Sequence, residues 1–145
     1  MAHAIFVAEA KRRQISVDVY SAGVFDFRGS PPIRETTTTC KLNNTPAPEE
    51  IATWIGDLPL ESISHFLVME QLHADVLMYE YGVSPTRVRL LGKFDPHNRG
   101  AEIDDPFGQS SAVYQESYEL IRDCIVNYLE SAEALQGQSS SKTEK

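Results

Sequence analysis

A chain of 145 residues with 41% hydrophobic and 23% charged side chains suits one soluble domain built around a single core. Its formal net charge of −8 argues against nucleic acid or an anionic membrane as the main partner, because both are negatively charged. No apolar run approaches the roughly 18 residues of a spanning helix, and no signal peptide opens the sequence, so we expect a cytoplasmic protein.

The cysteines and histidines predict neither a disulfide framework nor a metal centre. Cys40 and Cys124 lie far apart in the sequence, and the four histidines lack the spacing of metal ligands. We therefore expect a protein that uses no metal and no other cofactor. Cys124 falls within an apolar stripe, where a free cysteine behaves as a small buried hydrophobic residue.

The first third of the chain is expected to contain two helices and one strand. Residues 1–13 are alanine-rich and end in three cations, which predicts a helix. Residues 15–20 alternate apolar and polar side chains, which predicts a strand. The small residues 21–23 follow as a turn. A second helix is expected over residues 32–42, although four consecutive threonines are poor helix formers.

Two further strands are expected in the rest of the chain, each followed by a helix. Residues 65–69 and 88–91 are short apolar runs of the kind found in buried strands. Apolar residues recur at helical spacing over residues 70–81. The last helix is expected from residue 112 to about 135, and the serine-rich residues 136–145 are expected to form a disordered tail.

This order of elements predicts an α/β domain over residues 1–135. Alternating helices and strands imply a parallel sheet with helices on both faces. Functional residues of such sheets lie on loops at the carboxyl ends of strands. The long polar loop after strand 88–91 is therefore where we expect a functional site.

Asp105 is the candidate catalytic residue on this loop. Pro106 restricts the backbone of Asp105 to an extended conformation, which gives the carboxylate a defined direction. A positioned aspartate can act as a general acid. From these residues alone the simpler interpretation is favoured, in which Asp105 initiates a turn or caps the helix that follows.

A series of short motifs runs from the first residue to about residue 130. They are Met1 to Phe6, Ser21-Ala22-Gly23, Gly29-Ser30-Pro31-Pro32, the strand 66–69 with its helix, residues 88–96, and Asp105-Pro106-Phe107-Gly108. In this order and at this spacing they resemble the motifs of the low molecular weight protein-tyrosine phosphatases, which share their fold with a class of arsenate reductases. The resemblance implies a flavodoxin-like sheet of four parallel strands in the order 2-1-3-4.

The resemblance also implies a reaction, the hydrolysis of a phosphomonoester on a phosphotyrosine protein or a small molecule. In the family, a cysteine thiolate in a Cys-x5-Arg loop attacks phosphorus, and the arginine binds the phosphate oxygens. An aspartate before proline protonates the leaving group. This aspartate aligns with Asp105, which reverses the interpretation favoured above. Ser21 aligns with a serine that supports the phosphate loop, whereas Asp95 before Pro96 aligns with an aspartate that has no catalytic role.

The Cys-x5-Arg loop is absent from the sequence. The sixth residue after Cys40 is Pro46, and the sixth after Cys124 is Glu130. Met1 aligns with the residue just after the loop, so the loop and the first, central strand of the sheet would precede it. We therefore expect an amino-terminally truncated and inactive phosphatase.

Two alternatives stay open at this point. A catalytically dead pseudophosphatase would bind a partner protein through its remaining helices and loops. An arsenate reductase is disfavoured, because its chemistry needs several cysteines in relay and the two cysteines form no recognisable redox pair.

Overall fold

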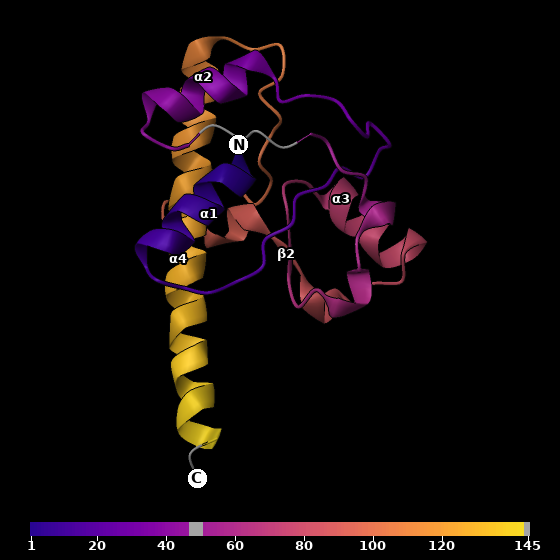
Figure 1. Cartoon of the computed structure of the whole chain (residues 1–145), viewed down its shortest axis with the longest axis vertical. Helices are drawn as coiled ribbons and strands as arrows, with labels where there is room; N and C mark the ends of the chain where they lie inside the picture. Colours follow the sequence, from indigo (N-terminus) through magenta and orange to yellow (C-terminus); the bar gives the residue numbers. More distant parts are fainter. Residues whose placement is uncertain (47–50, 144–145) are drawn as a thin grey trace.

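One long helix organises the molecule. The computed structural model describes the backbone of residues 1–46 and 51–143, and the side chains of these ranges up to residue 131. Helix α4 (Ser111–Thr143) runs the length of the structure, and the other elements lie beside its amino-terminal half (Figure 1). Within the described ranges, no helix is both long and apolar enough to cross a membrane.

Two shorter helices pack against α4. Helix α1 (Ala2–Arg12) confirms the helix predicted at the start of the chain. Helix α2 (Arg34–Leu42) begins two residues later than predicted, because Ile33 after the two prolines is still extended, with φ −69° and ψ 138°. The hydroxyl of Thr39 donates to the carbonyl of Glu35 at 2.7 Å, so at least one threonine is accommodated by bonding back to the helix.

Helix α4 extends further than predicted. It reaches Thr143, whereas the sequence placed its end near residue 135. No proline interrupts residues 111–143, so every residue of this stretch can donate its backbone N–H within the helix. The division of the chain into a domain of residues 1–135 and a tail of residues 136–145 stays a prediction.

A parallel pair of strands confirms the α/β class. Strands β1 (Phe66–Val68) and β2 (Val88–Leu90) pair in parallel. The connection between them is helix α3 (Gln71–Asp75), which continues as one stretch of π-helix (Val76–Glu80). Figure 1 shows α3 on one side of the strands and α1 with α4 on the other. Short 3₁₀ turns complete the elements: Ile55–Asp57, Leu60–Ser62, Pro85–Arg87 and η5 (Leu91–Phe94).

The prediction of a strand over residues 15–20 is wrong. This segment lacks strand structure, and the backbone of residues 16–22 forms no hydrogen bond with other described residues. The first pairing occurs at Gly23, which forms an isolated bridge with Trp54. Alternation shows which side chains would face a core, but a strand also needs a neighbour for its hydrogen bonds. The described sheet contains only β1 and β2, whereas three strands were expected in this chain once the first, central strand of the family's four-stranded sheet is left out.

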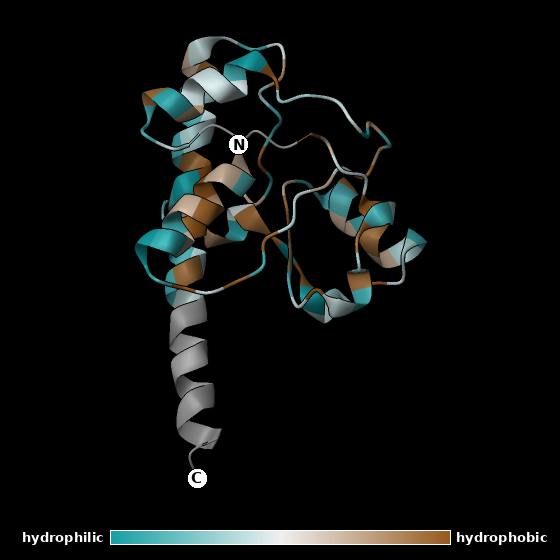
Figure 2. Ribbon diagram, viewed as in Figure 1, coloured by the Kyte–Doolittle hydropathy of each residue, from teal (hydrophilic) through white to brown (hydrophobic). Residues whose placement is uncertain are grey.

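The core consists of two clusters. The larger one packs the apolar stripe of α4 against α1 and against the chain that follows β2, and Figure 2 shows the brown hydrophobic stretches of α1 and α4 lying together. Its buried members are Ile5, Leu91, Ile103, Tyr118, Ile121, Cys124, Ile125 and Leu129. The smaller cluster joins the strands to α3, with Ile55, Phe66, Val68, Ala74, Leu77 and Val83 buried.

Replacing Leu129 with alanine is expected to lower the free energy of unfolding by about 2–5 kcal/mol, because the change leaves a cavity in the larger cluster. Leu129 is 2% exposed, whereas Leu42 at the end of α2 is 77% exposed. The matched change Leu42→Ala is expected to cost less than about 0.5 kcal/mol. Urea denaturation of both variants measures the difference, and equal losses would contradict the assigned core.

Candidate functional site

The loop between η5 and α4 carries the predicted proton donor, Asp105. This residue is exposed, and its Oδ1 accepts a hydrogen bond of 3.0 Å from the backbone N–H of Phe107. The contact confirms the turn that the simpler interpretation expected. The cap of α4 is a different residue, since Ser110 Oγ accepts a hydrogen bond from the N–H of Val113 at 3.3 Å. The second carboxylate oxygen of Asp105 forms no hydrogen bond with the described residues.

Asp95 lies at the start of the same loop, with its side chain fully buried. Its carboxylate accepts hydrogen bonds from the backbone N–H groups of His97 (3.0 Å) and Arg99 (2.7 Å). It also accepts bonds from Nε and Nη2 of Arg99, both at 3.0 Å. The Arg99 guanidinium holds the pKa of Asp95 well below its usual value, although burial acts in the opposite direction. The carboxylate therefore stays ionised and organises the first turn of the loop.

Two contacts tie this turn to α4. The Nη2 of Arg99 also donates to Oδ2 of Asp123 on α4 at 2.9 Å. The Nδ2 of Asn127, one turn further along α4, donates to the carbonyl of Phe94 at 2.7 Å. The beginning of the loop therefore has a defined position relative to the long helix.

Two further contacts tie the end of the loop to the carboxyl end of β1. The backbone N–H of Gln71 donates to Oε1 of Glu102 at 2.7 Å. The N–H of Ile103 donates to the carbonyl of Met69 at 2.9 Å, and the Ile103 side chain is buried. Asp105 follows Ile103 by two residues, so the structure places it beside the carboxyl end of a parallel strand, as the sequence predicted.

An open hollow of about 480 Å³ lies beside Asp105, between the loop and the first turns of α4. Most of its charged side chains are acidic. The charged residues that line it are Arg99, Glu102, Asp104, Asp105, Glu116 and Glu119. Arg99 is already paired with two aspartates. The hollow is therefore a region of negative potential with the Asp105 carboxylate on its wall.

The charge of Asp105 acts on groups from two helices. Burial lowers the pKa of the Met1 α-amino group, and the charges of Cys40 and Asp105 oppose that effect. Burial raises the pKa of the Tyr114 hydroxyl, and the carboxylates of Glu35 and Asp105 raise it further. The amino end of α1 and the first part of α4 are thus both within electrostatic reach of Asp105.

Ser21, the residue predicted to support a phosphate loop, is exposed and forms no hydrogen bond with other described residues. It precedes the bridge between Gly23 and Trp54 by two residues. No hydrogen bond joins Ser21 to Asp105 in the described part of the chain. The supporting role of Ser21 therefore stays a prediction.

Both cysteines are enclosed and unsuited to nucleophilic attack as they stand. Each is 0% exposed. Burial raises the pKa of the Cys40 thiol, and burial together with the charge of Asp95 raises the pKa of Cys124 to about 11. Among the described residues, no group of three or more histidine, cysteine, aspartate or glutamate side chains is placed to hold a metal ion.

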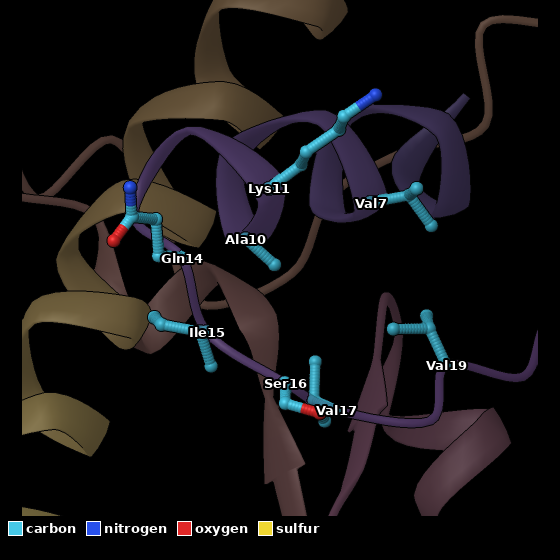
Figure 3. Close-up of a pocket in the computed structure, with 8 residues that line it drawn as sticks. All are labelled: Val7, Ala10, Lys11, Gln14, Ile15, Ser16, Val17 and Val19. Atoms are coloured by element: carbon cyan, nitrogen blue, oxygen red, sulfur yellow. The ribbon is translucent and has the colours of Figure 1, made fainter.

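A second hollow, of about 360 Å³, lies between α1 and the extended segment that follows it. Figure 3 shows Val17 and Val19 projecting from that segment towards the helix that carries Val7 and Ala10. The lining is mainly apolar, and Lys11 is its only charged residue. None of the predicted site residues contributes to this hollow, which therefore does not extend the site around Asp105.

The sequence alone did not identify the residues that hold the loop. Asp95 was assigned no catalytic role by the resemblance, and its bonds to Arg99 were not predicted. The available signal for this ion pair was that Asp95 and Arg99, which carry opposite charges, are four residues apart. The contacts of Arg99 with Asp123 and of Glu102 with Gln71 had no local signal, because the partners are 24 and 31 residues apart.

Comparisons of sequence relate the chain to phosphatases. The family model for low molecular weight phosphotyrosine protein phosphatase matches residues 1–140. The chain is 31% identical over 108 residues to low molecular weight protein-tyrosine-phosphatase PtpB of Staphylococcus epidermidis, a match that covers 74% of this chain and 73% of that protein. It is 25% identical over 127 residues to a protein-arginine-phosphatase of Bacillus subtilis, covering 86% of this chain and 82% of that protein.

Comparisons of structure show the same fold. The YwlE arginine phosphatase from Geobacillus stearothermophilus superposes with a TM-score of 0.80 at 23% identity, over 94% of this chain and 86% of that one. A low molecular weight protein tyrosine phosphatase from T. tengcongensis superposes with a TM-score of 0.81 at 23% identity, over 90% of this chain and 88% of that one. Because the family model matches nearly the whole sequence, the chain belongs to the low molecular weight phosphotyrosine protein phosphatases.

Proposed function

We propose that this chain supplies the proton donor for hydrolysis of a phosphorylated protein side chain, with Asp105 in that role. The observation that carries the proposal is geometric: Met1 and Ala2, at the amino end of α1, pack against the core cluster that contains Ile103, and Asp105 follows Ile103 by two residues. Helix amino ends favour anions, because their N–H groups and dipole point towards the bound charge. In the resemblance described above, the helix aligned with α1 directly follows the phosphate loop. A phosphoryl group bound there would lie on the side of the molecule that carries Asp105.

The reaction proposed has two steps. A cysteine thiolate forms a bond to phosphorus while the bond to the leaving group breaks, and Asp105 gives its proton to the leaving atom. Water then attacks the phosphocysteine, Asp105 takes a proton from that water, and the sulfur–phosphorus bond breaks to release phosphate. Asp105 can exchange protons in this way because one of its oxygens orients the turn while the other has no partner in the described chain.

The nucleophile of this reaction is proposed to be neither Cys40 nor Cys124. Both thiols are buried with raised pKa values, and neither is followed by arginine at the sixth position. We therefore propose that residues 1–145 alone do not hydrolyse phosphomonoesters. Activity would require a Cys-x5-Arg loop at the amino end of α1, in a segment joined to the chain.

Phosphotyrosine in a protein is the substrate we propose. The matching family model and the Staphylococcus relative are both named for tyrosine phosphatases. The likeness to a protein-arginine-phosphatase makes phosphoarginine the comparison substrate. Cytoplasmic location and the absence of a nucleic-acid partner stay predictions.

The 145-residue chain is expected to release no phosphate from phosphotyrosine peptide, phosphoarginine peptide or para-nitrophenyl phosphate above the rate without protein. A fusion in which a relative's first strand and Cys-x5-Arg loop precede Met1 is expected to hydrolyse them, with the phosphotyrosine peptide preferred. Asp105→Asn in the fusion is expected to lower kcat for this peptide about 10²–10⁴-fold, because the poor leaving group is no longer protonated. The loss should be smaller for para-nitrophenyl phosphate, whose leaving group is more stable.

Controls separate the roles in this experiment. Asp104→Asn changes the charge of the hollow by the same amount beside the proposed donor and is expected to preserve most of the activity. Cysteine-to-serine replacement in the added loop should abolish it. Turnover by the unfused chain, or equal losses for Asp104→Asn and Asp105→Asn, would contradict the proposal. A cooperatively folded fusion without activity would instead favour a pseudophosphatase.

The two thiols are expected to resist modification in the native chain at neutral pH, since both are 0% exposed and mostly protonated. With an aromatic disulfide reagent, the coloured thiol product is expected from neither cysteine in the native chain and from both cysteines in denaturant. Fast modification of either thiol in the native chain would contradict this prediction and make that thiol a candidate nucleophile. Cys124→Ser and Cys40→Ser would then identify the reactive residue.

A further inference from the structure

The first half of the loop that leads to Asp105 is a tight bend, in which Gly100 and Ala101 pack directly against Gly92. A side chain does not fit at Gly92, because its Cβ would lie 2.3 Å from the carbonyl oxygen of Ala101 and 2.8 Å from that of Gly100. Asn98 and Gly100 have positive φ values of 51° and 137°, which turn the chain back. The Asp95 carboxylate is bonded to the backbone within this bend, so its charge and the path of the loop are interdependent.

The second half of the loop passes directly from this bend to Asp105. Arg99 is held by Asp95 and by Asp123 of α4, and Ile103 is held by the end of β1 only four residues later. Asp105 follows after two more residues and is restricted by Pro106. Only a few residues separate the bend at residues 95–99 from Asp105. A change in the conformation of the bend is therefore expected to move Asp105.

We propose that Asp95 is a positioning residue for Asp105: its buried carboxylate holds the bend that determines where the proton donor lies. This inference rests on the proposed role of Asp105, and it assigns to the first Asp-Pro pair of the loop a function that the sequence did not suggest. Asp95 itself does not transfer protons. All four of its hydrogen bonds are made to nitrogen donors, and its carboxylate stays ionised.

The competing interpretation is that Asp95 only stabilises the folded state. A buried ion pair that loses one charge usually destabilises a protein, so loss of stability by itself does not separate the two roles. They differ in what happens while the protein is still folded. A positioning role predicts a local change at Ile103, Phe107 and the Asp105 carboxylate, whereas a purely stabilising role predicts faster opening of the whole structure.

The test is amide hydrogen exchange and carbon-13 spectroscopy of the 145-residue chain with Asp95→Asn. Exchange of the Ile103 and Phe107 amides is expected to accelerate at least about tenfold more than exchange of the α4 amides of Ile125 and Leu129, which report opening of the whole structure. The side-chain carboxyl signal of Asp105 is expected to shift at constant pH. Unchanged signals at Ile103 and Asp105 would overturn the proposal, and so would uniform acceleration of all four amides.

Two further variants sharpen the result. Asp123→Asn removes one carboxylate from the same guanidinium but keeps all four bonds of Asp95, so Asp105 is expected to change little. Arg99→Lys keeps the positive charge and loses the planar fork, so it should reproduce the local change in part, even if Asp95→Asn fails to fold. An effect of Asp123→Asn equal to that of Arg99→Lys would overturn the proposal. These measurements need no catalysis, so their failure is distinguishable from a failure of the proposed reaction.

Discussion

The packing of α4 against three separate parts of the chain is the constraint on which the structure depends. One apolar stripe of this helix contacts Ile5 of α1, Leu91 after β2, and Ile103 near the end of the functional loop. Burial of apolar area is the main favourable term in folding, so these contacts can specify relative position without a large sheet. The amino end of α1 and the loop with Asp105 are thereby both placed relative to one helix.

The helices and the two short strands were predictable because their signals are local. A helix satisfies its backbone within its own segment, so the apolar spacing of α4 was sufficient to predict it from about residue 112. The apolar runs at Phe66–Val68 and Val88–Leu90 were bounded well enough to be identified as strands. The period-two pattern of residues 15–20 was just as clear, yet hydrogen bonding in a sheet depends on a second segment. A pattern within one segment does not show whether that neighbour is present.

The position of Asp105 was also predictable, and its support was not. The sequence placed it on the loop after the last strand, where α/β sheets carry their functional groups. The contacts that hold the loop join residues 24 to 34 positions apart, such as Arg99 with Asp123 and Ile103 with Met69. Each of these partners is an ordinary polar or apolar residue in its own segment. Their pairing follows from the way α4 and β1 pack, which no local pattern contains.

The two Asp-Pro pairs of this loop show how environment separates residues with the same local sequence. In both, proline restricts the aspartate backbone, and one carboxylate oxygen accepts a backbone N–H two residues later. Asp95 is buried and accepts hydrogen bonds from Nε and Nη2 of Arg99, which hold the pKa of its carboxyl well below the usual value. Asp105 is exposed, and one of its oxygens is unoccupied in the described chain. The second arrangement suits the proton transfer that we propose for Asp105, whereas the first leaves a fixed charge that suits the positioning role that we propose for Asp95.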